Sequence, residues 1–336
     1  MNPARWLAAA MIALTACAST AEGQTVNVEA DITGGIAQYP DESISALATQ
    51  LRLFGELKSS VQFFVEGSWA GRNEDESDAF SSAYPYEGHP TVMEAYAERM
   101  FHPRGALFGI RAGRYRTPFG IYSRGDYAYS GLIRAPLIRY DDYFALENTF
   151  LEHGVDLIAG IPRFTVETSL SAPGDAGEAQ RRSGFDSVTR AQGYYGPLLV
   201  GVSHLRSNPY QTEDFVHGRT VFTGLDFRFM LGGVQVSGEW IDGQPFEGAS
   251  TTGWHIGSSV HRPFMGPVTA VVRFEQLDCD NGSVLVLHAK RQTIGARVRL
   301  PRGLTAQVGY LHHTGFEEDE YGSAFDAALT YSVRLR

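Results

Sequence analysis

The side chains best suited to hydrolytic chemistry are His204 and Ser207, because a nearby histidine can activate a serine hydroxyl as a nucleophile. Residues three apart on a β-strand point to opposite faces, so this pair could meet only where a strand ends between them. No Gly-x-Ser-x-Gly elbow, phosphate-binding loop or dinucleotide fingerprint stands in a strand-to-helix context. We therefore expect no enzyme, no catalytic residue and no cofactor.

Two clusters could in principle chelate a divalent ion: His312 and His313 with the acidic run at 317–320, and the acidic run at 74–78. Adjacent histidines on a strand face opposite ways, and acidic runs in loops are usually solvated. We predict no metal site, with a surface contact to calcium as the alternative for these carboxylates.

Most other charged residues belong to a pattern with a period of two. Segments 61–69, 220–229 and 325–335 place apolar or small residues at every second position and mainly polar residues between them. Leu225, for example, belongs to the apolar set of its segment, and Asp226 and Arg228 belong to the polar set. A strand of about ten residues with one apolar and one wet face has the length and pattern of a tilted membrane-spanning strand.

Sixteen segments fit this pattern. They are residues 25–34, 46–58, 61–70, 91–101, 106–117, 154–161, 163–172, 184–192, 196–206, 218–231, 233–242, 251–261, 267–277, 287–300, 303–313 and 322–335. An even number of strands places the N-terminus and the C-terminus of a barrel on the same side of the membrane, the periplasmic side.

The connections between these segments alternate in length. Short turns lie at 58–60, 102–105, 161–163, 193–197, 231–233, 262–266 and 301–303, and long polar loops at 71–90, 118–153, 173–183, 207–217 and 314–321. A soluble sandwich has no reason to sort its loops in this way. The sequence predicts an all-β fold, a transmembrane antiparallel up-and-down β-barrel of about 16 strands with short periplasmic turns and long extracellular loops.

Composition supports the same class of protein. After the N-terminus no apolar run approaches the ~20 residues of a helical membrane span, and 37 Gly, 20 Phe and 16 Tyr favour turns and strands. The net charge of −10 offers no basic surface for phosphates, so we expect no nucleic-acid partner. Aromatic residues near segment ends, among them Trp69, Tyr96, Tyr115, Trp240 and Tyr331, fit a girdle at the membrane interface; the alternative is that strands simply favour aromatics.

The N-terminus has the layout of a secretion signal, with Arg5 before an apolar stretch and small residues after it. We expect a signal peptide over residues 1–21 and the barrel over 22–336; the alternative is a lipid-modified Cys17, since residues 14–17 resemble a lipobox. If Cys17 is removed, Cys279 stands alone and no disulfide can form within the chain.

Residues 113–120, Gly-Arg-Tyr-Arg-Thr-Pro-Phe-Gly, end the fifth predicted strand and open the longest loop. This element resembles one found in bacterial outer-membrane porins of the phosphate-selective (O/P) type. The resemblance implies a sixteen-stranded general or anion-preferring porin in the outer membrane, a homotrimer, with the long loop folded into the lumen as a constriction. Two features depart from the family: the chain ends in Arg336 rather than an aromatic residue, and its only lysines are Lys58 and Lys290, so phosphate specificity is not carried over.

Selectivity in a wide pore comes from charged side chains on its wall and at its narrowest point. The alternation places these arginines on the wet face as candidate pore-lining residues: Arg52, Arg228, Arg273, Arg291, Arg297, Arg299 and Arg334. Lys58 and eight acidic residues share that face, so the wall is nearly neutral, with a basic side formed by residues 273–299 and 334. The loop at 118–153 adds candidate constriction residues of both signs, Arg124, Arg134, Arg139, Asp141 and Asp142; the alternative is an ordinary solvated extracellular loop.

The sequence thus favours a porin that forms a water-filled channel for passive diffusion of ions and small hydrophilic solutes. Its expected partners are outer-membrane lipid, lipopolysaccharide, and the solutes or anions that pass through. The alternatives are a structural or adhesive barrel, which would insert without conducting, and a secreted soluble β-protein, which would need no detergent.

Overall fold

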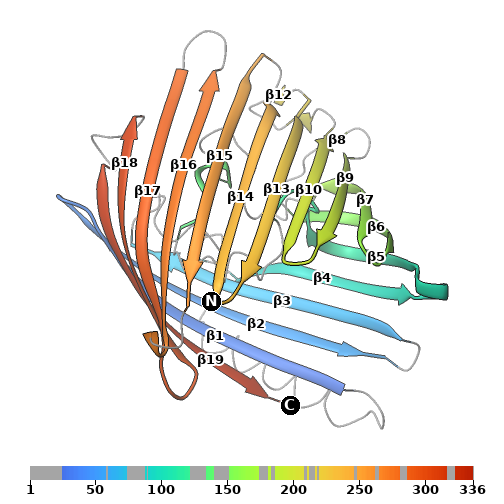
Figure 1. Cartoon of the computed structure of the whole chain (residues 1–336), viewed down its shortest axis with the longest axis horizontal. Helices are drawn as coiled ribbons and strands as arrows, with labels where there is room; N and C mark the ends of the chain where they lie inside the picture. The colour runs from blue at the N-terminus through green and yellow to red at the C-terminus, as the bar shows by residue number, and fades with distance from the viewer. Residues whose placement is uncertain are drawn as a thin grey trace.

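The computed structural model describes residues 25–57, 60–73, 88, 90–121, 134–139, 151–173, 181–182, 186–207, 210–211, 216–217, 219–245, 248–261, 265–280, 286–315 and 322–335. Within these residues no helix is long and apolar enough to cross a membrane. Sixteen of the strands form one closed antiparallel barrel, in which β19 pairs with β1 to complete the ring (Figure 1).

The barrel strands follow the chain in order. Their bounds are β1 Thr25–Gln38, β2 Ser43–Glu56, β3 Val61–Arg72, β4 Pro90–Phe101, β5 Leu107–Arg116, β6 Leu151–Ile161, β7 Phe164–Pro173, β9 Asp186–Tyr195, β10 Leu198–Arg206, β13 Val221–Leu231, β14 Val234–Gln244, β15 Ser250–Val260, β16 Val268–Asp280, β17 Val286–Arg299, β18 Leu304–Gly315 and β19 Ser323–Leu335. The predicted fold class and all sixteen predicted segments are confirmed.

The side chains invert the burial pattern of a soluble protein. Along β13, Leu225 is 50% exposed and its neighbour Asp226 only 2%. The same contrast runs round the ring, with large apolar side chains such as Val155, Leu157 and Ile294 exposed outside. Charged side chains are buried inside, including those of Glu66, Asp156, Arg190, Glu275 and Arg291. An apolar exterior and a polar interior are the pattern of a barrel that stands in lipid.

The two ends of the barrel differ as the sequence predicted. At one end the strands are joined by tight turns, several of which place a residue in the left-handed region, such as Arg302 and Gly303 with φ of 62° and 79°. A Cβ at Gly303 would overlap the carbonyl oxygen of Ser332, so this turn requires glycine. The long connections lie at the other end.

Two details differ from the prediction. β1 and β2 run on to a tight turn, closed by the Tyr39 N–H donating to the Glu42 carbonyl (2.9 Å), where a longer loop was expected. The alternation weakens there because apolar residues such as Ala37 and Ile44 also occupy inward positions, where they form a small buried cluster. Two long loops also contribute a small sheet made of β8 (Arg181–Arg182), β11 (Tyr210–Gln211) and β12 (Val216–His217), which the sequence did not predict.

The aromatic girdle is only partly correct. Trp240 and Tyr331 are outward and partly exposed, as expected. Tyr96 and Tyr115 instead face the interior, where the Arg111 guanidinium lies over both rings, 5.1 and 5.8 Å from their centroids. Aromatic rings suit an inner wall when a cation covers their face, and sequence position alone does not separate the two environments.

Candidate pore lining and constriction

The seven predicted pore-lining arginines all lie on the inward face of their strands. Arg273 and Arg291 are buried there directly. Residues an even number of positions apart on one strand share a face. Arg228 therefore faces inward like the buried Asp226, Arg297 and Arg299 like the buried Arg291, and Arg334 like the buried Asp326. Arg52 contacts Glu29, Asp31 and Glu66 at 3.4, 2.6 and 3.6 Å.

The wall of β16 and β17 carries a compact charge cluster. The Glu275 carboxylate accepts hydrogen bonds from the Arg273 Nε (2.6 Å) and from Arg291 (3.1 Å). All three side chains are almost completely buried. Two cations around one carboxylate leave this part of the wall positive, and removing one partner of such a buried pair costs ~3–5 kcal/mol.

Several inward charges were not predicted. Arg111 on β5 joins Glu98, Asp156 and Glu167 from three other strands, at 3.1, 3.2 and 3.1 Å. Arg190 on β9 contacts Asp226 on β13 at 2.6 Å, across the intervening β10. The alternation of Ile110, Arg111 and Ala112 could have revealed Arg111, whereas Arg190 lies between Thr189 and Ala191, which are not strongly apolar and do not mark the outward face.

The described inward charges divide between two halves of the wall. On β1 to β7 they are eight carboxylates, Glu29, Asp31, Glu56, Glu66, Glu94, Glu98, Asp156 and Glu167, and four arginines, Arg52, Arg72, Arg111 and Arg116. On β9 to β19 they are five carboxylates, Asp186, Asp226, Glu239, Glu275 and Asp326, and seven arginines, Arg190, Arg228, Arg273, Arg291, Arg297, Arg299 and Arg334. An acidic half therefore faces a basic half across the barrel.

Residues 113–120, whose sequence resembles the porin element, bring the chain from the wall into the interior. Gly113 has a φ of 133°, and a Cβ there would overlap the backbone of β4. The Phe119 ring lies 2.8 Å from where a Cβ of Gly224 would stand. The Gly120 N–H donates to the Ser203 Oγ at 3.0 Å, and the Glu239 carboxylate occupies the place of a Gly120 Cβ. Gly224 on the wall makes room for the Phe119 ring, and Gly120 in the loop makes room for the Glu239 carboxylate, so the loop can approach the wall closely.

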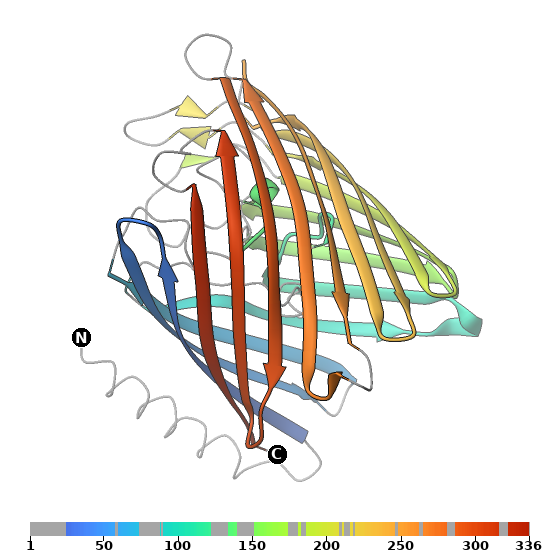
Figure 2. The ribbon, with the colours of Figure 1, turned by 60° about the vertical axis from the view of Figure 1, so that its left-hand side comes forward.

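A second part of the long loop, residues 134–139, also lies inside the barrel, and we call it the docked segment. It contains the short turn η2 (Leu137–Arg139), which Figure 2 shows in green within the ring of strands. All six of its residues are buried. Two of the predicted constriction residues, Arg134 and Arg139, are thus in the interior, and the alternative of a solvated loop is wrong for them. The other three, Arg124, Asp141 and Asp142, lie outside the described residues.

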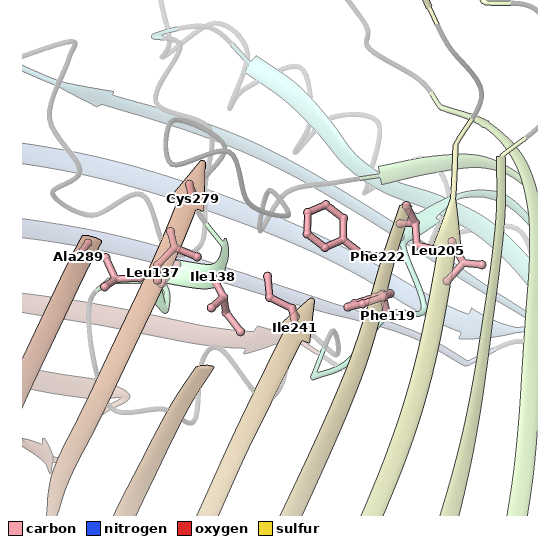
Figure 3. Close-up of a cluster of buried hydrophobic side chains, with 11 residues drawn as sticks. Phe119, Leu137, Ile138, Leu205, Phe222, Ile241, Cys279 and Ala289 are labelled. Atoms are coloured by element: carbon pink, nitrogen blue, oxygen red, sulfur yellow. The ribbon is translucent and has the colours of Figure 1, made fainter. Parts of the chain in front are cut away.

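The docked segment rests on an apolar cluster of the inner wall (Figure 3). Leu137 and Ile138 pack there with inward side chains of the wall, and the Ile138 Cγ2 lies 2.7 Å from where a Cβ of Gly253 would stand. The cluster consists of Phe119, Ala135, Leu137, Ile138, Val188, Leu205, Phe222, Ile241, Leu277, Cys279 and Ala289. Apolar residues on an otherwise polar inner face thus mark the place where the loop packs.

Among the described residues, those with catalytic or metal-binding chemistry do not assemble a site; the acidic runs at 74–78 and 317–320 lie outside the described residues. His204 faces outward, where its Nδ1 makes a hydrogen bond with the Thr223 hydroxyl at 3.2 Å. Ser207 is buried, and its hydroxyl accepts from the Thr220 N–H at 3.3 Å. The two lie on opposite faces, as do the exposed His312 and the buried His313. Within the described ranges no three His, Cys, Asp or Glu side chains are grouped so that they could hold a metal ion.

Solved structures of bacterial outer-membrane proteins share this barrel. OmpF of Salmonella typhi, solved in a complex with daunomycin, matches 93% of this chain and 97% of its own, with a TM-score of 0.65 at 12% identity. An anion-selective porin from Comamonas acidovorans matches 92% of this chain and 100% of its own, with a TM-score of 0.61 at 12% identity. The chain has the porin fold. A loop-deletion mutant of OmpT from Vibrio cholerae matches similarly, over 93% and 100% of the two chains with a TM-score of 0.64 at 10% identity.

No family model matches the sequence, and no curated protein matches it. Identities of 10–12% show the fold alone. The phosphate-selective family indicated by residues 113–120 therefore stays a prediction. The porin fold and the apolar exterior agree with the predicted location in the outer membrane.

The described part of the inner wall is rich in charged side chains. Many of its charged side chains are held by ion pairs between strands, such as Arg111 with Asp156 and Arg190 with Asp226, so the field that they create inside the barrel is fixed. A fixed field on a pore wall sorts ions by sign and orients dipolar solutes.

Proposed function

We propose that the protein is an outer-membrane porin, a water-filled channel through which ions and small hydrophilic solutes diffuse passively. The observation that supports this most directly is the closed barrel of sixteen strands with an apolar exterior and a charged interior. Barrels of this strand number are wide enough to hold an aqueous channel, whereas small barrels fill with side chains.

The docked segment narrows this channel in our proposal. It lies against β14 to β19, so solutes pass between it and the acidic wall of β1 to β7. Arg139 and the arginines of β16 and β17 then stand opposite the carboxylates of β3 to β7. The narrow part of the channel has a transverse field in this arrangement.

An anion preference belongs to the same proposal. With Arg134 and Arg139 included, the basic half of the interior has nine arginines and five carboxylates among the described side chains. The resemblance to phosphate-selective porins rests on residues 113–120, and the wall lacks the many lysines of that family. We therefore propose a preference for small anions in general.

The proposed surroundings are outer-membrane lipid and lipopolysaccharide, with three copies assembled as a homotrimer. One of the solved relatives, OmpT of Vibrio cholerae, is described in a trimer form. The second candidate is a barrel that inserts without conducting, for which the buried docked segment provides a reason, because it occupies part of the interior.

Swelling of lipid vesicles tests the proposal. Vesicles that contain the refolded protein should swell in iso-osmotic solutions of small uncharged sugars, more slowly as the sugar grows, and vesicles with heat-denatured protein should not. Absence of swelling with protein shown to be folded and inserted would favour the non-conducting barrel.

A further inference from the structure

The loop arginines were expected to act on passing ions, but their contacts give them another role. The Arg134 guanidinium donates two hydrogen bonds to the Asp326 carboxylate of β19, at 2.7 and 2.8 Å, and a third to the Tyr39 hydroxyl at 2.6 Å. Arg139 contacts Glu239 of β14 at 2.5 Å and donates to the Phe119 carbonyl at 3.0 Å. Each end of the docked segment is thus fixed to a wall carboxylate.

The middle of the segment is held by its backbone. The Leu137 N–H donates to the Glu275 Oε2 at 2.7 Å. Arg273 donates to the carbonyls of Arg134 and Ala135 at 2.9 and 3.1 Å, and Arg291 donates to the Ala135 carbonyl as well. The charge cluster of β16 and β17 therefore points its donors at the loop.

We propose that Arg134, Arg139, Arg273 and Arg291 are positioning residues that dock the loop, and that ion selectivity is set by Arg228, Arg297 and Arg299 nearer the end of the short turns. This inference deepens the proposed function and rests on it, but the docking can be measured without conduction. Ion pairs that span two segments hold geometry strongly, because each partner left alone would be a buried charge. Arg228, Arg297 and Arg299 lie on β13 and β17 away from the docked segment.

The chain contains a reporter of this docking. Cys279 is 5% exposed and belongs to the same apolar cluster as Leu137 and Ile138 of the docked segment. When the docked segment leaves the wall, the Cys279 thiol becomes accessible from water. In the full chain with Cys17→Ser, Cys279 is the only cysteine, so its reaction with a charged, membrane-impermeant maleimide reads the docking directly.

We expect slow labelling of Cys279 in this Cys17→Ser protein reconstituted in vesicles, and labelling at least tenfold faster after Asp326→Asn or Glu239→Gln. The exchange Arg134→Asp with Asp326→Arg should restore slow labelling, which loss of stability alone would not explain. Arg299→Gln is the matched control, since it removes an inward arginine away from the segment, and its labelling rate should stay at the parent value.

Folding is checked separately by the heat-dependent migration of the barrel in detergent gels. Should the carboxylate variants fail to fold, Gly253→Val serves as a second test. It keeps every charge, fills the space beside Ile138 and introduces a residue that suits a strand, and it should also accelerate labelling.

In bilayers the undocked variants should show a larger conductance. The double variant Arg297→Gln with Arg299→Gln should show a shifted reversal potential at nearly the parent conductance. Parent labelling rates in folded Asp326→Asn, Glu239→Gln and Gly253→Val proteins would overturn the docking role. Folded barrels with docking-dependent labelling and no conduction would overturn the proposed function and the assignment of selectivity, and leave the docking role standing.

Discussion

An arginine in place of Leu225 tests which face of the barrel meets lipid. Leu225 is half exposed and stands fifth in the eleven residues of β13, between Val202 of β10 and Trp240 of β14. This position is close to the middle of the strand, where a lipid-facing arginine destabilises a barrel by about 2–4 kcal/mol. Such a loss corresponds to a decrease of about thirtyfold to a thousandfold in the folding equilibrium constant.

The matched control is Gln192→Arg, which adds the same charge to the inward face. Gln192 pairs with Gly201, and Gly201 pairs with Asp226, so this position also lies in the middle part of the wall, two strands away from Leu225. Urea titration in phospholipid vesicles, followed by tryptophan fluorescence, gives the free energy of unfolding for both variants. We expect a clear loss for Leu225→Arg and a value near the parent for Gln192→Arg. Equal stability of parent and Leu225→Arg, or a loss confined to Gln192→Arg, would refute the assignment of the two faces.

Three further predictions concern selectivity, packing and processing. Arg297→Glu with Arg299→Glu should move the reversal potential in a salt gradient toward cation preference; an unchanged potential would exclude these two arginines as determinants. Tyr115→Phe removes the hydrogen bond to the Ser169 hydroxyl (2.7 Å) and should cost about 1 kcal/mol in urea unfolding, whereas Thr168→Val, on the outward face, should cost less. The mass of protein purified from outer membranes should correspond to cleavage after Ala21, and a mass that includes a lipid-bearing cysteine would contradict the predicted signal peptide.

Much of the wall could be predicted because lipid on one side and polar groups on the other impose a strict period of two. That pattern revealed sixteen strands and placed residues such as Arg291 and Arg297 on the inward face. It failed at Tyr96, because a tyrosine fits either face, and at Arg190, because its outward neighbours Thr189 and Ala191 are not strongly apolar.

The docked segment could not be predicted in the same way. Its sequence, Arg-Ala-Pro-Leu-Ile-Arg, shows only a short apolar stretch between two arginines. The partner of Arg134 is Asp326, 192 positions away in the chain, and it becomes a neighbour only when the ring closes at β1 and β19. The signal in the sequence was a set of apolar residues at inward positions, such as Phe222 and Ile241, where polar residues are expected. These residues form part of the surface on which the docked segment packs.

The most direct test of the central claim, that this barrel is a pore, is the single-channel conductance of the purified protein in a planar bilayer with a salt gradient across it. We predict stable steps of uniform size and a reversal potential of the sign given by anion preference. Protein that is shown to be folded and inserted, but produces no steps at any voltage, would contradict the porin function.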